Sequence, residues 1–143
     1  MKERSNARFS IVQALYTIEA SGDTVDNVLK HSNWSESGNP PKKDEELFVT
    51  TVHGVIAKKD ELDNIINPTL TMDWTIERID SVLRAILRAA THEIISRLDI
   101  PPKVTVNEYV IVTKKFFDKG QEITIANAIL DKIAHSIRSN EMI

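Results

Sequence analysis

Apolar side chains recur every three or four residues along most of this chain, and this helical spacing constrains the fold more than any other feature. The strongest example runs from about residue 75 to residue 98. Its broad apolar face predicts a helix at the centre of the protein, and it consists of Ile76, Ile79, Leu83, Ile86, Leu87, Ala90 and Ile94. No segment alternates apolar and polar residues for long enough to predict a strand. The spacing therefore predicts an all-α protein.

The same spacing predicts about six helices joined by short connections. They are expected at about residues 6–20, 23–31, 44–66, 75–98, 105–117 and 121–138. All 5 prolines fall between these ranges, so none has to interrupt a helix. Gly54 lies inside the third helix, where glycine costs roughly 1 kcal/mol relative to alanine. A glycine in that position indicates either that another helix approaches closely or that the fold tolerates a local defect.

The length of 143 residues predicts one domain spanning 1–143, because domains typically hold roughly 100–200 residues. Residues 35–43 form the clearest loop and could pass for a linker. The segment before this loop is too short to hold a core alone. We therefore expect one domain, with Trp34 covering an edge of the core.

Composition excludes several classes of protein. The chain has no cysteine, which excludes a disulfide scaffold, a thiol nucleophile and cysteine-ligated metals. No apolar run approaches the roughly 20 residues of a membrane-spanning helix, and no signal peptide opens the chain. The expected location is therefore the cytoplasm. With a net charge of −3, any binding to nucleic acid must use a local basic patch.

The sequence carries no catalytic motif, so we expect no enzyme, no metal and no cofactor. His92 to Ser96 resembles the zinc-protease motif, but Ser96 stands where the second histidine must be. The simpler interpretation of His92 is a partly exposed histidine on a helix.

Three local pairings follow from spacing alone. Asp80 with Arg84, and Glu93 with Arg97, place the acid four residues before the base, the favourable order for a helical ion pair. Thr105 through Glu108 fits a capping box at the start of the fifth helix.

Two basic segments are the remaining candidates for function. The first holds Lys2, Arg4 and Arg8, and the second holds Lys114, Lys115 and Lys119. Three polar residues follow the second segment: Gln121, Thr124 and Asn127. Either these are ordinary surface charges, or they form a two-part patch in which cations contact phosphates and polar groups reach the bases of single-stranded RNA.

Four stretches, in order along nearly the whole chain, resemble the bacterial NusB family of transcription antitermination factors. They are Ala7-Arg8 with Val12 to Tyr16, Arg78 to Asp80 with Ala85 to Arg88 and His92 to Ile94, Ile100 to Glu108, and Ala126 to Ala134. The resemblance implies an all-helical fold of two helical subdomains and a non-catalytic role. NusB-like proteins pair with NusE, a small ribosomal subunit protein, and the pair binds boxA-type single-stranded RNA. With RNA polymerase they support read-through of terminators, especially on ribosomal RNA operons.

The resemblance also carries over a few residues. The arginine-rich start of the family maps onto Arg4 to Arg8, which implies phosphate contacts by Arg4 and Arg8. The family's RNA contacts near its last helix map onto Gln121, Thr124, Ile125 and Asn127, flanked by Lys115 and Lys119. Its NusE-binding face implies Glu77, Asp80 and Arg84 as partner contacts.

Departures from the family pattern leave alternatives open. Ser5 and Asn6 replace basic residues, Ile125 replaces an aromatic residue that stacks on RNA, and Ala128 replaces a glycine. A scaffold that binds NusE with weak or lost RNA binding is therefore the main alternative. A module of an RNA cytosine methyltransferase is a further one, although the chain holds neither that domain nor its cysteine nucleophile. The sequence leaves both a monomer and a homodimer open.

Overall fold

The computed structural model describes residues 2–30, 42–71 and 74–142, with the side chains of residues 2–5, 42 and 43 outside the description. The elements are α1 (Lys2–Ser21), α2 (Val25–Lys30), α3 (Lys42–Ala57), α4 (Lys59–Ile66), α5 (Ser81–Ser96), α6 (Pro102–Phe116) and α7 (Glu122–Ile137), with 3-10 turns at Asn67–Thr69 and Ser139–Glu141. These described residues contain no strand. The prediction of an all-α fold is confirmed.

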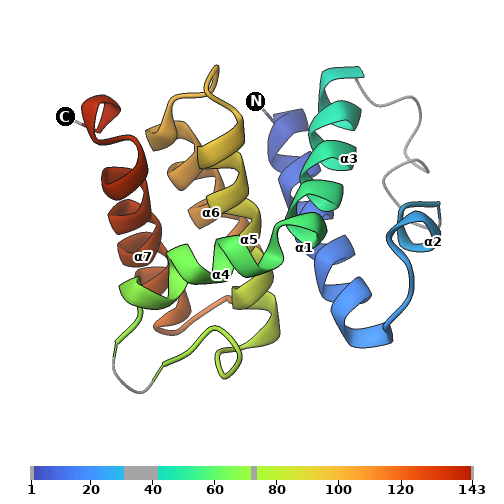
Figure 1. The fold of residues 1–143 in the computed structure, drawn as a ribbon, viewed down its shortest axis with the longest axis horizontal. Helices are drawn as coiled ribbons and strands as arrows, with labels where there is room; N and C mark the ends of the chain where they lie inside the picture. Colours follow the sequence, from blue (N-terminus) through green and yellow to red (C-terminus); the bar gives the residue numbers. More distant parts are fainter. Residues whose placement is uncertain (1, 31–41, 72–73, 143) are drawn as a thin grey trace.

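Helix α5 is the centre of the molecule, as its broad apolar face predicts. It packs against α1, α3, α4, α6 and α7. Every residue from Ala85 to Ile94 is buried. Figure 1 shows α1, α2 and α3 on one side of α5. Helices α6 and α7 lie on the other side, and α4 lies crosswise. The two groups of helices share one apolar core through α5.

Two of the predicted helices differ most from the structure. The helix predicted at 44–66 is two helices, α3 and α4, which meet at Lys58. The helix predicted at 75–98 begins only at Ser81, because the Asp80 side chain accepts hydrogen bonds from the backbone N–H groups of Val82 and Leu83. Ile76 and Ile79 are buried from the preceding turn, so their burial extended the apolar pattern beyond the helix.

The capping box predicted at Thr105 is wrong. Helix α6 begins at Pro102, with Pro101 as its N-cap. A proline suits the first turn of a helix because its missing N–H would have no partner there. Thr105 and Glu108 therefore lie inside the helix, where both are buried.

Parts of the predicted loop at 35–43 and the predicted role of Trp34 lie outside the described residues. Within the described part of the chain, no helix is long and apolar enough to cross a membrane.

Candidate nucleic-acid interface

The turn between α6 and α7 presents an exposed cationic and polar surface. Its residues were predicted from the sequence, and the structure leaves all of them exposed: Lys115, Lys119, Gln121, Thr124 and Asn127. We call this set the α6–α7 surface. Neither lysine of this surface forms an ion pair with a residue that the structure describes. Both ammonium groups are therefore available to an anionic ligand.

The first half of α1 lies against the end of α6, which brings together two segments about a hundred residues apart in the sequence. The rings of Phe9 and Phe116 stack with their centroids 4.6 Å apart. The Lys115 ammonium lies 5.6 Å from the centroid of the Phe9 ring, within the range of a cation–π contact. Lys2 and Arg4 lie in the first turns of α1, before Phe9, and their side chains are outside the description.

Arg8 does not belong to this surface, so its predicted phosphate contact is revised. Its side chain is 1 % exposed. The guanidinium donates hydrogen bonds of 3.0 and 2.8 Å to the two carboxylate oxygens of Glu93. A second carboxylate, that of Glu108, lies 3.9 Å away. Burial disfavours the charge of Arg8, but the hydrogen bond and the nearby carboxylates outweigh burial and raise its pKa.

The buried Arg8–Glu93 pair joins three helices. The Thr105 hydroxyl of α6 donates to the same Glu93 carboxylate at 2.7 Å, and the Arg8 guanidinium lies 5.9 Å from the centroid of the Tyr109 ring. Burial and the charge of Glu93 raise the pKa of Tyr109 well above its usual value. We call Arg8, Glu93, Thr105, Glu108 and Tyr109 the buried cluster. Sequence reasoning missed it, although Arg8 falls on the helical stripe of Ile11 and Val12 and so on the buried side of α1.

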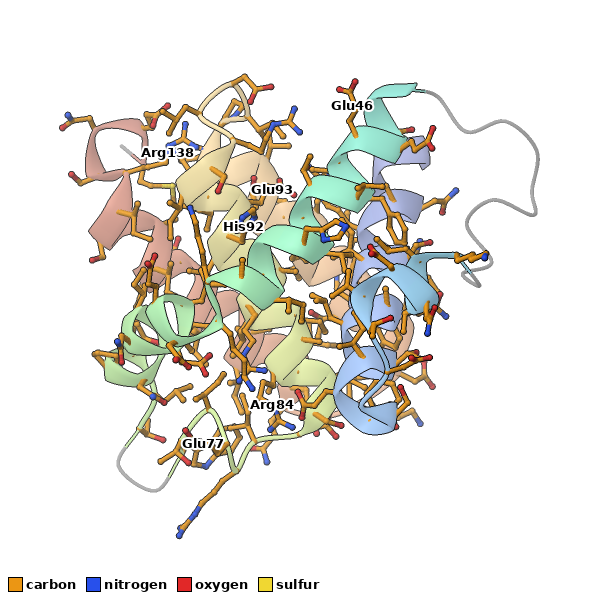
Figure 2. The ribbon with its side chains drawn as sticks, turned by 45° about the vertical axis from the view of Figure 1, so that its right-hand side comes forward. Glu46, Glu77, Arg84, His92, Glu93 and Arg138 are labelled. Atoms are coloured by element: carbon orange, nitrogen blue, oxygen red, sulfur yellow. The ribbon has the colours of Figure 1, made fainter. Side chains whose placement is uncertain are left out.

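The three predicted partner-binding residues have different environments. Glu77 is exposed. Asp80 caps α5, and Arg84 binds the Glu19 carboxylate of α1 and donates to the carbonyls of Ile76, Glu77 and Ile79. Figure 2 shows Glu77 and Arg84 at the same end of the molecule. Of these three residues, only Glu77 has a side chain that forms no hydrogen bond or ion pair with a residue that the structure describes.

The two helical ion pairs predicted from spacing are wrong. Arg84 pairs with Glu19 rather than Asp80, and Arg97 pairs with Asp99 at 3.0 Å. Glu93, the acid predicted for Arg97, pairs with Arg8. Arg84 and Glu93 thus pair with residues that the fold brings close, whereas Arg97, beyond the last residue of α5, pairs with a residue two positions along the chain.

His92 lies inside the molecule, so the expectation of a partly exposed histidine is wrong. It is 8 % exposed and packs against Gly54, where a Cβ atom would lie 2.0 Å from the His92 Nε2. The close approach predicted at Gly54 is therefore confirmed. The Ser96 Oγ lies 3.3 Å from that nitrogen, while the buried Nδ1 has no hydrogen-bond partner among the described residues. Burial, and then the charge of Lys58, lower the pKa of His92. No group of three potential metal ligands occurs in the part of the chain that the structure describes.

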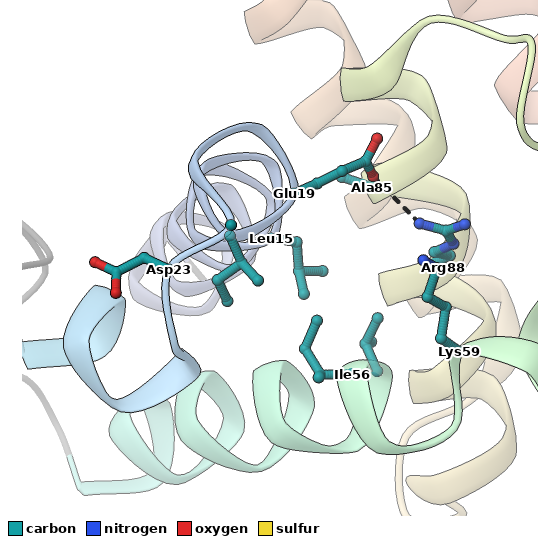
Figure 3. A pocket seen from close by; sticks show the side chains of 10 residues that line it. Leu15, Glu19, Asp23, Ile56, Lys59, Ala85 and Arg88 are labelled. Atoms are coloured by element: carbon teal, nitrogen blue, oxygen red, sulfur yellow. Dashed lines mark hydrogen bonds and ion pairs between the residues drawn. The ribbon is translucent and has the colours of Figure 1, made fainter.

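A cavity of about 350 Å³ lies between α1, α3 and α5. Figure 3 shows its apolar wall, which includes Leu15 and Ile56, beside the charged side chain of Arg88. Arg88 donates to Asp63 at 2.8 Å and to Glu19 at 3.3 Å. These ion pairs join α5 to α4 and α1, so the arginine supports the fold at this cavity.

Comparisons with known proteins agree on one family. The NusB family model matches residues 5–135. The transcription antitermination protein NusB of Bartonella tribocorum is 38 % identical over 142 residues, covering 95 % of this chain and 90 % of that protein. A structure of T. maritima NusB is 25 % identical, with a TM-score of 0.82 over 96 % of this chain and 95 % of that chain. A crystal structure of the antitermination factors NusB and NusE in complex with double-stranded RNA has the same fold, at 24 % identity and a TM-score of 0.82 over 95 % of this chain and 98 % of that chain.

Proposed function

Because this chain belongs to the NusB family, we propose that it is a transcription antitermination factor that binds boxA-type RNA together with NusE. The observation that carries the proposal is the exposed cationic and polar α6–α7 surface. Phe9 of α1, the helix that carries the first basic segment, packs beside this surface against Phe116 and Lys115.

The residues of this surface divide into two tasks. Lys115 and Lys119, with Lys2 and Arg4 at the start of α1, contact phosphates and position the RNA. The polar side chains reach the edges of unstacked bases and supply sequence preference: Gln121, Thr124 and Asn127. The buried cluster takes no part in binding, because the Arg8 guanidinium is already occupied by Glu93.

NusE binds at the end of the molecule where α5 begins. Exposed Glu77 can contact a partner there directly, while Asp80 and Arg84 hold the turn that presents it. The complex acts on RNA polymerase in the cytoplasm and favours read-through, especially on ribosomal RNA operons. No catalytic step is required of this chain.

A scaffold that binds NusE with little RNA affinity is the second candidate. The burial of Arg8 favours it, since this removes one of the cations counted at the start of the chain. Ile125 favours it as well, because an aliphatic side chain forfeits base stacking worth roughly 1–3 kcal/mol.

The decisive experiment is fluorescence anisotropy of a labelled boxA-type RNA, titrated with this protein alone and with NusE, at two salt concentrations. A duplex of the same sequence shows whether single or double strands are preferred. Binding that tightens with NusE and weakens with salt supports the antitermination factor. Capture of NusE without RNA binding in either titration supports the scaffold.

The matched variants are Lys115→Ala/Lys119→Ala and Lys30→Ala, which removes an exposed lysine of α2 away from the surface. Each lost phosphate contact lowers the slope of log affinity against log salt by about 0.7 for single-stranded RNA. The double variant is expected to lose slope and affinity, and the Lys30 variant neither. An unchanged slope in the double variant contradicts the assignment of the surface.

A further inference from the structure

A second cavity, of about 280 Å³, lies where the turn before α5 meets the start of α7, and it is lined by Trp74, Arg78, Ile79, Asp80, Leu83 and Glu122. We propose that this cavity binds one unstacked nucleobase that carries an amino group, as part of an RNA held on the neighbouring α6–α7 surface. The inference rests on the proposed function and adds a specific base site to it.

The walls of the cavity suit a flat aromatic ring. Trp74 is partly buried and packs against the core, so its indole is held in place rather than free to rotate in solvent. Ile79 is 8 % exposed and Leu83 1 % exposed, which gives the cavity an aliphatic side made of fixed core residues. Unstacked RNA bases are commonly held by stacking on aromatic side chains. The volume lies just below the range of about 300–1,000 Å³ for small-molecule pockets, which fits one base rather than a whole nucleotide.

The polar groups of the cavity favour the base of a nucleotide over its phosphate. Glu122 and Arg78 form no ion pair or side-chain hydrogen bond with any residue that the structure describes. Asp80 uses its Oδ1 to cap α5, so its Oδ2 remains an acceptor. Two carboxylates inside a cavity disfavour a phosphate and accept hydrogen bonds from the amino groups of adenine, cytosine or guanine. Arg78, exposed at the rim, is placed to contact the phosphate that follows the base.

The position of the cavity links it to the proposed RNA path. Glu122 is the first residue of α7 and directly follows Gln121 of the α6–α7 surface. Figure 1 shows the start of α5 and the start of α7 at the same end of the molecule. An RNA whose phosphates lie on Lys115 and Lys119 can therefore turn one base into this cavity.

The first test compares boxA-type RNA binding by the full chain, by Trp74→Ala and by Trp74→Phe, with Leu98→Ala as the matched control. Leu98 is 71 % exposed and lies beyond the other end of α5. Trp74→Ala is expected to weaken binding about 5- to 150-fold, the loss that alanine substitution causes at a base-stacking aromatic residue. Trp74→Phe keeps an aromatic face and is expected to retain most of the affinity. Circular dichroism identifies any variant that fails to fold. For that case Glu122→Gln, a change at a half-buried residue, tests the same cavity and should weaken binding to amino-bearing bases.

A double-mutant cycle then identifies the base. Each base of the RNA is removed in turn, and the affinity is measured with the full chain and with Trp74→Ala. One abasic position should weaken binding to the full chain but add little to the loss in Trp74→Ala, because both changes remove the same contact. In a Trp34→Phe variant, in which Trp74 is the remaining tryptophan, that same abasic position should abolish the RNA-dependent change in indole fluorescence.

The outcomes separate this inference from the proposed function. Normal RNA binding by Trp74→Ala, or losses that add at every abasic position, overturns the base site while the antitermination factor stands. Loss of NusE capture with unchanged RNA affinity also overturns it and assigns the cavity to the protein partner. Absence of RNA binding by the full chain, with and without NusE, overturns both.

Discussion

The buried cluster and the α6–α7 surface both hold charged and polar side chains, but in opposite environments. In the buried cluster, the Arg8 and Glu93 side chains are 1 % and 0 % exposed, and each charge has a fixed partner. On the α6–α7 surface, Lys115 and Lys119 are exposed and have no carboxylate partner among the described residues. A desolvated charge needs its partner for the fold, whereas a hydrated charge remains available to a ligand.

The difference teaches that a residue of a basic segment does not necessarily contact nucleic acid. Arg8 follows Lys2 and Arg4 in the sequence, yet the helical turn that carries it faces α5 and α6. The comparison predicts that changes in the buried cluster alter stability first, and that changes on the α6–α7 surface alter RNA binding first.

The largest effect is expected for Glu93→Gln. The substitution leaves the buried Arg8 charge without its main carboxylate, so the free energy of unfolding should fall by about 3–5 kcal/mol. Urea denaturation followed by circular dichroism measures the loss. The apolar pair Arg8→Met/Glu93→Leu should recover much of it, because no buried charge then lacks a partner. A loss below about 1 kcal/mol in Glu93→Gln would contradict a structural role for the pair.

A smaller loss of stability is expected for Gly54→Ala. This variant compares the cost of overpacking the interior with the cost of breaking the buried ion pair. The new Cβ would lie 2.0 Å from the His92 Nε2, so the His92 ring or one of the two helices has to shift. Overpacking of this kind costs about 1–3 kcal/mol. Thermal unfolding measures the loss, and His92→Ala in the same chain should reduce it by making room. Equal losses with and without His92→Ala would show that the overlap is not the cause.

The reverse pattern is expected for Lys115→Ala/Lys119→Ala. Because both side chains are exposed, the free energy of unfolding should change by no more than about 0.5 kcal/mol, while RNA affinity falls. Urea denaturation and RNA titration of the same preparation measure both quantities. A large loss of stability would remove the distinction between the two regions.

The smallest expected effect is a loss of stability at acidic pH that comes from His92, and this loss is absent at neutral pH. Because burial lowers its pKa in the folded protein, the unfolded chain binds the proton more readily as the pH falls through the ordinary histidine pKa of about 6.5. The contribution of His92 to stability should therefore be complete above that pH and decline below it. Urea midpoints measured from pH 7.5 to pH 5.5 should fall less for His92→Gln than for the unchanged chain. Parallel curves for the two would contradict the proposed burial effect.

Much of the α6–α7 surface could be predicted from local sequence. Lysines and polar residues on either side of Gly120 mark an exposed turn between two apolar helices, and the structure leaves them exposed. Gly54 was also informative, because a glycine inside a helix indicates close packing, although the sequence did not identify His92 as the neighbour. The base cavity could not be predicted, since it depends on how Trp74 and Glu122, from distant parts of the chain, meet beside α5.

The sequence by itself determined the helical class, most helix positions and the family, because helical periodicity and short motifs are local properties of the chain. The tertiary structure decided which charges are buried. Buried Arg8 pairs with Glu93 and buried Arg138 donates to backbone carbonyls at and beyond the end of α5, while partly exposed Arg84 pairs with Glu19. Spacing predicted local partners, but a buried charge requires the strongest available compensation, and only helix packing brings those distant groups within hydrogen-bond distance.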